Sequence, residues 1–151
     1  MNGLENFRYI GEFQHTIDSK KRLTIPARWR FPGDEAEVYL ALPNPEGFIS
    51  VYPPAKVAQI QEKVSQISMG DKEGQKLLMY LSSMAHSFGC DKQGRIHLNE
   101  QLIQHAGIVK ESIFLGNFTT FSIWSPKRYK ASQTRIHNAK NFAQTLVQFG
   151  L

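Results

Sequence analysis

Residues 15–25 read His-Thr-Ile-Asp-Ser-Lys-Lys-Arg-Leu-Thr-Ile, and residues 91–96 read Asp-Lys-Gln-Gly-Arg-Ile. Both segments contain the pattern Asp-x-x-x-Arg-aliphatic, which starts at Asp18 in one copy and at Asp91 in the other. With a shift of one residue, the aliphatic-aromatic pairs at residues 51–52 and 123–124 also align. Repetition at a fixed spacing is the signature of a duplicated structural unit. The chain is therefore expected to contain two copies of one unit.

Each copy shows the same order of expected elements. Apolar patterning predicts a strand, a polar turn at the Asp-x-x-x-Arg element, a short strand, a helix start and two more strands. Pro26 suits the first turn of a helix, Asn99 suits an N-cap, and Gly107 suits a helix end. The expected strands are 13–17, 22–25, 37–42 and 48–52, then 85–90, 95–98, 112–115 and 120–124; the helix starts are 26–30 and 99–106; the turns are 43–47 and 116–117. The pattern predicts an α+β fold of two tandem β-rich repeats.

Longer amphipathic helices are expected between and after the repeats. Residues 54–68 and 71–84 carry apolar stripes at helical spacing, and a less regular stripe follows residue 126. We interpret the first two stripes as covers for the sheets of their own repeats, with subunit contacts as the alternative; for the last stripe both remain open. Each half has about 75 residues, which makes a separate core marginal, so the halves should pack together. The predicted divisions are 7–53 (first repeat), 54–84 (helical connector), 85–126 (second repeat) and 127–151 (basic C-terminal helix or tail).

The charge of this 151-residue chain is segregated. The net charge is +5, yet residues 15–30 carry five basic residues against one acidic residue, and residues 126–151 carry five against none. A concentrated basic segment indicates a polyanionic partner, although a solvated basic face is the simpler alternative. The single cysteine, the lack of a long apolar run and the lack of an apolar leader at the N-terminus favour a cytoplasmic protein without a membrane partner.

The Asp-x-x-x-Arg element has a chemical use in a tight turn. The carboxylate can accept backbone N–H groups of the turn and hold the guanidinium in a bidentate pair. An arginine held in this way keeps donors for a phosphate or a guanine edge. Lys20 and Lys21 at the tip of the first turn add attraction to phosphate. For one copy alone a surface ion pair is the better interpretation, and the recurrence of the element favours a functional role.

These elements resemble the signature of the MraZ family of bacterial transcriptional regulators. The similarity covers residues 15–30 and residues 90–96, and with the strand at residues 9–13 it extends over roughly residues 7–148. The resemblance implies two tandem AbrB-type, swapped-hairpin domains with added helices, which assemble into ring-like homo-oligomers. It also implies binding of double-stranded DNA at short repeated sites in the promoter of the division and cell-wall gene cluster, repression there, and a location at the nucleoid.

The resemblance and the charge cluster together assign the DNA-binding residues. The resemblance implies roles for both Asp-Arg pairs and for Lys20, and the basic cluster adds Lys21, Arg28 and Arg30 to the predicted site. The candidates are Asp18, Lys20, Lys21, Arg22, Arg28, Arg30, Asp91 and Arg95. Because most of these cations belong to the first copy, we expect that copy to carry most of the DNA binding.

Lys21 departs from the family pattern, which usually has glycine before the first arginine; Gly94 keeps that residue in the second copy. If the turn requires a positive φ, lysine there is strained by about 1 kcal/mol. Lys21 either bears this strain or contributes a phosphate contact, and we favour the contact.

Other chemistry is not favoured by the sequence. The five histidines lack metal-ligand spacing, Cys90 takes the place of Ile17 in the repeat, and no catalytic or nucleotide-binding motif is present. Cys90 is expected to be a buried small side chain. Trp29 and Trp124 are expected in the core or an interface rather than against bases. We expect no enzyme, no metal and no cofactor; the alternative functions are an RNA-binding module and a ring-forming scaffold.

Overall fold

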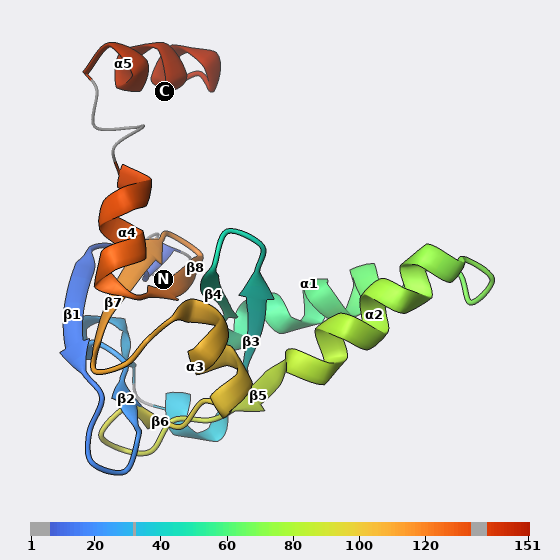
Figure 1. The fold of residues 1–151 in the computed structure, drawn as a ribbon, viewed down its shortest axis with the longest axis horizontal. Coiled ribbons are helices and arrows are strands. Elements are labelled where there is room, and N and C mark those ends of the chain that lie inside the picture. Colours follow the sequence, from blue (N-terminus) through green and yellow to red (C-terminus); the bar gives the residue numbers. More distant parts are fainter. Residues whose placement is uncertain (1–6, 32, 134–138) are drawn as a thin grey trace.

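The computed structural model describes residues 7–31, 33–133 and 139–151. Two layers make up its body: a six-stranded sheet in the order β1-β7-β8-β4-β3-β5, and a layer formed by the β2–β6 ribbon with α3 and the short helix η2 (Figure 1). The strands are β1 (Glu12–Thr16), β2 (Leu23–Thr24), β3 (Tyr39–Asn44), β4 (Phe48–Tyr52), β5 (His86–Phe88), β6 (Arg95–Ile96), β7 (Glu111–Asn117) and β8 (Thr120–Trp124). The helices are η2 (Ala27–Trp29), η3 (Asp34–Ala36), α1 (Pro54–Ser65), α2 (Lys72–Met84), α3 (Glu100–Ala106), α4 (Pro126–Gln133) and α5 (Ala139–Gln148). The predicted α+β class is confirmed.

The two repeats exchange their first strands. β1 of the first repeat pairs with β7 of the second, and β5 of the second pairs with β3 of the first. At the centre β4 pairs with β8, and β2 pairs with β6 so that Leu23 lies opposite its own counterpart Ile96. The two repeats are thus related by an approximate two-fold axis, and the sheet contains three strands from each half.

The two repeats differ in length by one residue, and this difference lies in the loop of the β3–β4 and β7–β8 hairpins. In the first repeat Asn44 pairs with Phe48, which leaves three loop residues; in the second Asn117 pairs with Thr120, which leaves two. The spacing between equivalent positions of the repeats is therefore one residue shorter after this loop than before it. The turn expected at 116–117 instead lies at residues 118–119, and Phe118 enters the left-handed region with a φ of 62°.

The helix that follows β2 differs from the one that follows β6. Asn99 caps α3 by accepting a hydrogen bond from the Leu102 backbone N–H at 2.9 Å, and Gly107 ends it with a φ of 67°. At the equivalent place after β2 the first repeat forms the single 3₁₀ turn η2, whose N-cap Pro26 makes no side-chain capping bond. The α-helix expected from residue 26 is thus one short turn.

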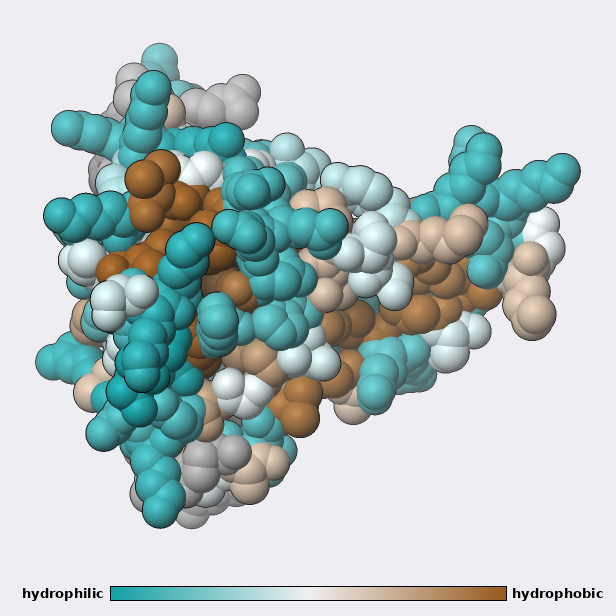
Figure 2. All heavy atoms as spheres, turned by 60° about the horizontal axis from the view of Figure 1, so that its bottom comes forward, coloured by the Kyte–Doolittle hydropathy of each residue, from teal (hydrophilic) through white to brown (hydrophobic). Residues whose placement is uncertain are grey.

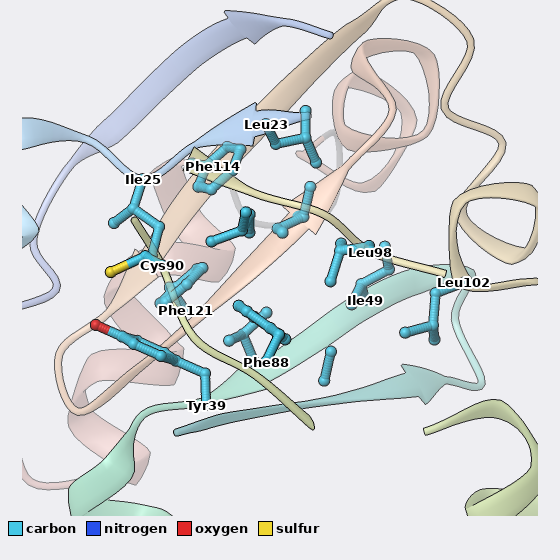
Figure 3. Close-up of a cluster of buried hydrophobic side chains, with 14 of the residues drawn as sticks. Leu23, Ile25, Tyr39, Ile49, Phe88, Cys90, Leu98, Leu102, Phe114 and Phe121 are labelled. Carbon is cyan, nitrogen blue, oxygen red and sulfur yellow. The ribbon is translucent and has the colours of Figure 1, made fainter. Parts of the chain in front are cut away.

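The core lies between the two layers and contains side chains from both repeats (Figure 3). Trp29 is fully buried, packs edge-on against Tyr9 and Phe13, and donates from Nε1 to the Ile10 carbonyl at 3.1 Å. Trp124 is buried on the other side of the sheet and stacks on Phe48 with ring centres 4.0 Å apart. Both tryptophans thus pack against aromatic side chains, Trp29 within the core cluster and Trp124 outside it.

Cys90 is buried as the repeat alignment predicts. The hydroxyl of Tyr39 points toward it in Figure 3. Burial of that hydroxyl raises the pKa of Tyr39 well above its ordinary value, because the phenolate would lose its hydration. Cys90 and Tyr39 therefore belong to the core.

Helices α1 and α2 do not cover the sheet over most of their length. They contact β3 and β4 only near their sheet-proximal ends and extend away from the body as an arm (Figure 1). Neither helix has a buried residue, and the side chains of Leu77, Met79 and Tyr80 are at least half exposed. Apolar side chains follow the arm in Figure 2. The stripes therefore cover their own sheet only in part: both helices contact β3, while the stripe residues Val64 and Leu77 are exposed.

One basic residue of the C-terminal segment, Arg128, bonds to the body of the protein. α4 packs on β7, and Arg128 in α4 donates to the carbonyls of Gly47 and His105. The apolar side chains of α5 are exposed, with Phe142 at 48% and Val147 at 80%. Residues 134–138, which include Arg135 and part of the expected stripe, lie outside the described residues.

Gly116 is required by a close approach of two backbones. A Cβ at this position would lie 2.3 Å from the Tyr9 carbonyl oxygen, which already accepts the Phe118 N–H. We expect Gly116→Ala to destabilise the protein by about 1–3 kcal/mol, because the N-terminal segment must move to relieve the clash. Gly70→Ala is the matched control, since its Cβ meets nothing closer than 3.7 Å. Urea unfolding measures both variants, and equal stability of the two would refute the assigned contact.

Candidate functional site

The first Asp-x-x-x-Arg turn is closed by its own aspartate. Asp18 Oδ1 accepts the backbone N–H groups of Lys20 at 2.9 Å and Arg22 at 2.8 Å. Asp18 Oδ2 accepts from Arg22 Nε at 2.8 Å. These bonds, the Arg22 backbone N–H foremost, lower the pKa of Asp18, so the carboxylate is charged at neutral pH.

The second turn repeats this arrangement atom for atom. Asp91 Oδ1 accepts the N–H groups of Gln93 and Arg95, each at 2.9 Å, and Oδ2 accepts from Arg95 Nε at 2.6 Å. The pKa of Asp91 is lowered for the same reasons. The predicted ion pairs are thus present, but they are not bidentate, because one carboxylate oxygen is taken by the backbone.

Each arginine is bonded to its aspartate through Nε alone, which determines which of its donors remain for a ligand. Within the described parts of the chain, no partner is found for the terminal Nη atoms of Arg22 or Arg95. The two side chains are 27% and 35% exposed, so each is fixed through Nε and presents its Nη groups at the surface. A guanidinium held in this way is suited to a phosphate oxygen or to the O6 and N7 atoms of guanine.

The β2–β6 ribbon brings the two turns together. Thr24 pairs with Arg95, and the Ile25 N–H donates to the Gly94 carbonyl at 2.8 Å. Both turns consequently lie at the end of the molecule away from α4 (Figure 1). Two segments from different halves of the sequence thereby form one surface.

Lys21 occupies the conformation that glycine usually supplies. Its φ is 59°, against 79° for Gly94 in the second turn. The Lys21 side chain is 76% exposed, and its Nζ lies 3.5 Å from Glu100 Oε1. The turn therefore does place Lys21 at a positive φ, and the phosphate contact stays a prediction.

Arg30 lies against the second turn rather than the first. Its side chain covers Gly94 so closely that a Cβ there would be 2.2 Å from Arg30 Cδ. Arg28, by contrast, is exposed on η2, and Lys20 is exposed at the tip of the first turn. The sequence cluster of residues 20–30 is therefore divided in space between the two turns. Lys92, which was not among the predicted site residues, lies beside Arg30 in the wall of a surface pocket.

The described residues show neither a metal site nor a membrane span. Across residues 7–31, 33–133 and 139–151, no group of three or more His, Cys, Asp or Glu side chains is placed to hold a metal ion. In the same part of the chain, no helix is long and apolar enough to cross a membrane.

Comparison with known proteins identifies the family. A family profile described as "MraZ protein, putative antitoxin-like" matches residues 81–149. A protein named "Transcriptional regulator MraZ" from Pediococcus pentosaceus is 31% identical over 144 residues, which cover 95% of this chain and 99% of the relative. The chain belongs to the MraZ family. The relative of the same name from Lactobacillus gasseri is 34% identical, over 91% of this chain and 96% of its own length. These family members are named as regulators rather than enzymes, which confirms the prediction that the chain is not an enzyme.

Lys21→Gly tests the strained turn of this family member. Glycine adopts a φ of 59° without a Cβ clash, and the relief exceeds the added flexibility of the unfolded chain. We expect the variant to gain about 1 kcal/mol or slightly less in the free energy of unfolding, measured in urea. Glu100→Gln, which removes only the exposed ion pair, should change it by less than about 0.5 kcal/mol. A loss of stability in Lys21→Gly would show that the turn is not strained.

Proposed function

We propose that this protein is a sequence-specific transcriptional regulator that binds double-stranded DNA through both Asp-x-x-x-Arg turns. The observation that supports the proposal most directly is the identical bracing of Arg22 and Arg95 by Asp18 and Asp91 on one surface. A surface ion pair with no further role has no reason to recur with the same three hydrogen bonds. The names of the family members, which are transcriptional regulators, support the same conclusion.

The electrostatics of this surface favour a polyanion. The two turns carry five cationic side chains, while both carboxylates are directed back into their own turns. Lysines at the tips supply attraction to phosphate that does not depend on sequence. The two fixed arginines supply directional donors, and the major groove of DNA is wide enough for a two-stranded ribbon.

The finer expectations from the family belong to the same proposal. We infer binding to short repeated sites in the promoter of the division and cell-wall gene cluster, with repression as the outcome, in the cytoplasm at the nucleoid. One protomer presents too few phosphate contacts for tight binding in physiological salt. An oligomer, in the form of a ring, would engage several repeats at once and increase affinity through effective concentration. The exposed apolar side chains of the α1–α2 arm and of α5 support self-association.

Arginine variants test the DNA surface. Arg22→Ala, in the copy expected to carry most of the DNA binding, should abolish specific binding to a promoter fragment. Arg95→Ala should weaken it by about 1–3 kcal/mol for the lost base contact. Lys127→Ala is the control, because Lys127 is an exposed cation on α4, at the end of the molecule away from the two turns. Gel-shift titrations with the promoter duplex, a random duplex and single-stranded RNA measure the effect.

Two outcomes would contradict the proposal. If both arginine variants bind the promoter as the wild type does, the turns are not the interface. If the wild type prefers RNA, or binds neither nucleic acid, the RNA-binding or scaffold alternative replaces DNA regulation. Melting temperatures show that each variant is folded.

Repeat spacing tests the role of assembly. We expect light scattering to give a mass several times the 17.2 kDa of one chain. Deleting one of two adjacent promoter repeats, or moving it by half a helical turn, should sharply reduce affinity because only one protomer could then bind. A monomer that binds a single repeat as tightly as two would exclude this mechanism.

A further inference from the structure

Two surface pockets occupy equivalent positions in the two halves. One lies between η2 and the second turn and includes Arg30 and Lys92; we call it the Arg30 pocket. The other lies between α3 and the first turn and includes Ile103 and Lys21. Arg30 and Ile103 are counterparts in the repeat alignment that matches the two Asp-x-x-x-Arg elements. Their volumes are similar, about 320 and 340 Å³. Each pocket therefore has walls from both repeats.

The chemistry of the two pockets has diverged. Where the Arg30 pocket has Arg30, Lys92 and Ala27, the equivalent positions hold Ile103, Ser19 and Glu100. The two cationic side chains of the Arg30 pocket thus correspond to an apolar and a neutral polar residue, and its alanine corresponds to an acidic residue. The other pocket includes Lys21, but this lysine lies 3.5 Å from Glu100 in the same wall, so the Arg30 pocket is the better suited of the two to an anion.

The Arg30 side chain is held in place by packing, but its hydrogen bonding is incomplete. Its side chain packs over Gly94, whose lack of a Cβ leaves the necessary space. The Nε atom of Arg30 is buried, and no hydrogen-bond partner for it is found among the described residues. A buried donor without a partner is unfavourable by about 1–3 kcal/mol, more when it is charged. Because Nε itself has no exposed surface, a ligand in the pocket would meet the guanidinium through its terminal nitrogens, and a negative charge there would offset part of this cost.

The carboxylates in the pocket wall do not meet this need. Asp34 accepts from Arg8 Nη1 and from the Phe31 N–H, each at 2.8 Å. Asp91 accepts from its own turn and from Arg95. Both acids are committed elsewhere, which leaves the cationic charge of Arg30 and Lys92 for an external anion.

We propose that the Arg30 pocket binds one backbone phosphate of the DNA that the two turns engage. This inference rests on the proposed function and adds a contact that lies off the turn tips. A phosphate oxygen accepts from the Arg30 guanidinium, and Lys92 at the rim adds charge attraction. The contact is with the backbone, so it fixes the position of the second turn and reads no bases.

Inorganic phosphate tests the pocket without DNA. In protein labelled with ¹⁵N at arginine Nε, the Arg30 Nε–H resonance, assigned by its loss in Arg30→Gln, should shift saturably as phosphate replaces chloride at constant ionic strength. Lys92→Gln should weaken this shift several-fold, whereas Lys63→Gln on the arm should leave it unchanged. An Arg30 resonance that does not respond to phosphate would overturn the proposal, whatever the DNA experiments show.

The salt dependence of DNA binding identifies the source of the phosphate. Arg30→Gln and, separately, Lys92→Gln should each reduce the slope of log K against log salt by up to about 0.9, equally on promoter and random DNA. Lys92 is exposed, so its variant keeps the test valid if Arg30→Gln is less stable. A phosphate-induced shift together with unchanged slopes would indicate a site for free phosphate and overturn the DNA assignment. That result would leave the proposed function intact if Arg22→Ala still loses promoter binding.

Discussion

The pairing of β1 with β7 and of β5 with β3 is the interaction on which the rest of the structure depends. Because each repeat completes its part of the sheet with a strand from the other, neither half has a core of its own. The same exchange forms the β2–β6 ribbon, since the chain that leaves each exchanged strand must return beside its counterpart. The ribbon in turn places both Asp-x-x-x-Arg turns at one end of the molecule. A charged surface built from two distant segments of the sequence is thus a direct consequence of hydrogen bonding between strands.

Approximate symmetry makes the differences between the halves informative. At the crossing of each turn with the opposite helix, the pair Gly94 and Arg30 in one half corresponds to Lys21 and Ile103 in the other. Where the turn has no side chain, a long arginine fills the space above it. Where the turn carries lysine, the helix presents a branched apolar residue, and the lysine reaches Glu100. At Gly94 the absence of a Cβ is what makes room for Arg30, whereas Lys21 and Ile103 both line the other pocket. One half gains an anion-binding character that the other lacks.

Packing also explains why the apolar stripes of α1 and α2 lie mostly outside the sheet. The spacing of apolar residues in α1 and α2 predicted both helices with nearly correct bounds, and Asp71 caps α2 through the Gly74 N–H. Periodicity specifies that a helix has an apolar face, but it does not specify what covers that face. Here the six-stranded sheet receives its inner layer from α3, η2 and the ribbon, so the arm extends beyond it. Its exposed face is consistent with contacts between subunits, the alternative left open by the sequence.

The sequence by itself determined the repeat, most of the strands, the cap of α3, the burial of Cys90 and the presence of an Asp–Arg pair in each turn, because these depend on residues close together in the chain. It also indicated the positive φ at Lys21, since the local turn geometry is the same in both copies. Only the tertiary structure decided which strand pairs with which, that Arg30 lies on the second turn, and that Arg128 holds a loop and a helix end. These depend on contacts between distant parts of the chain, where many partners have compatible chemistry. Their choice is fixed by the volume and the hydrogen bonds of the assembled core.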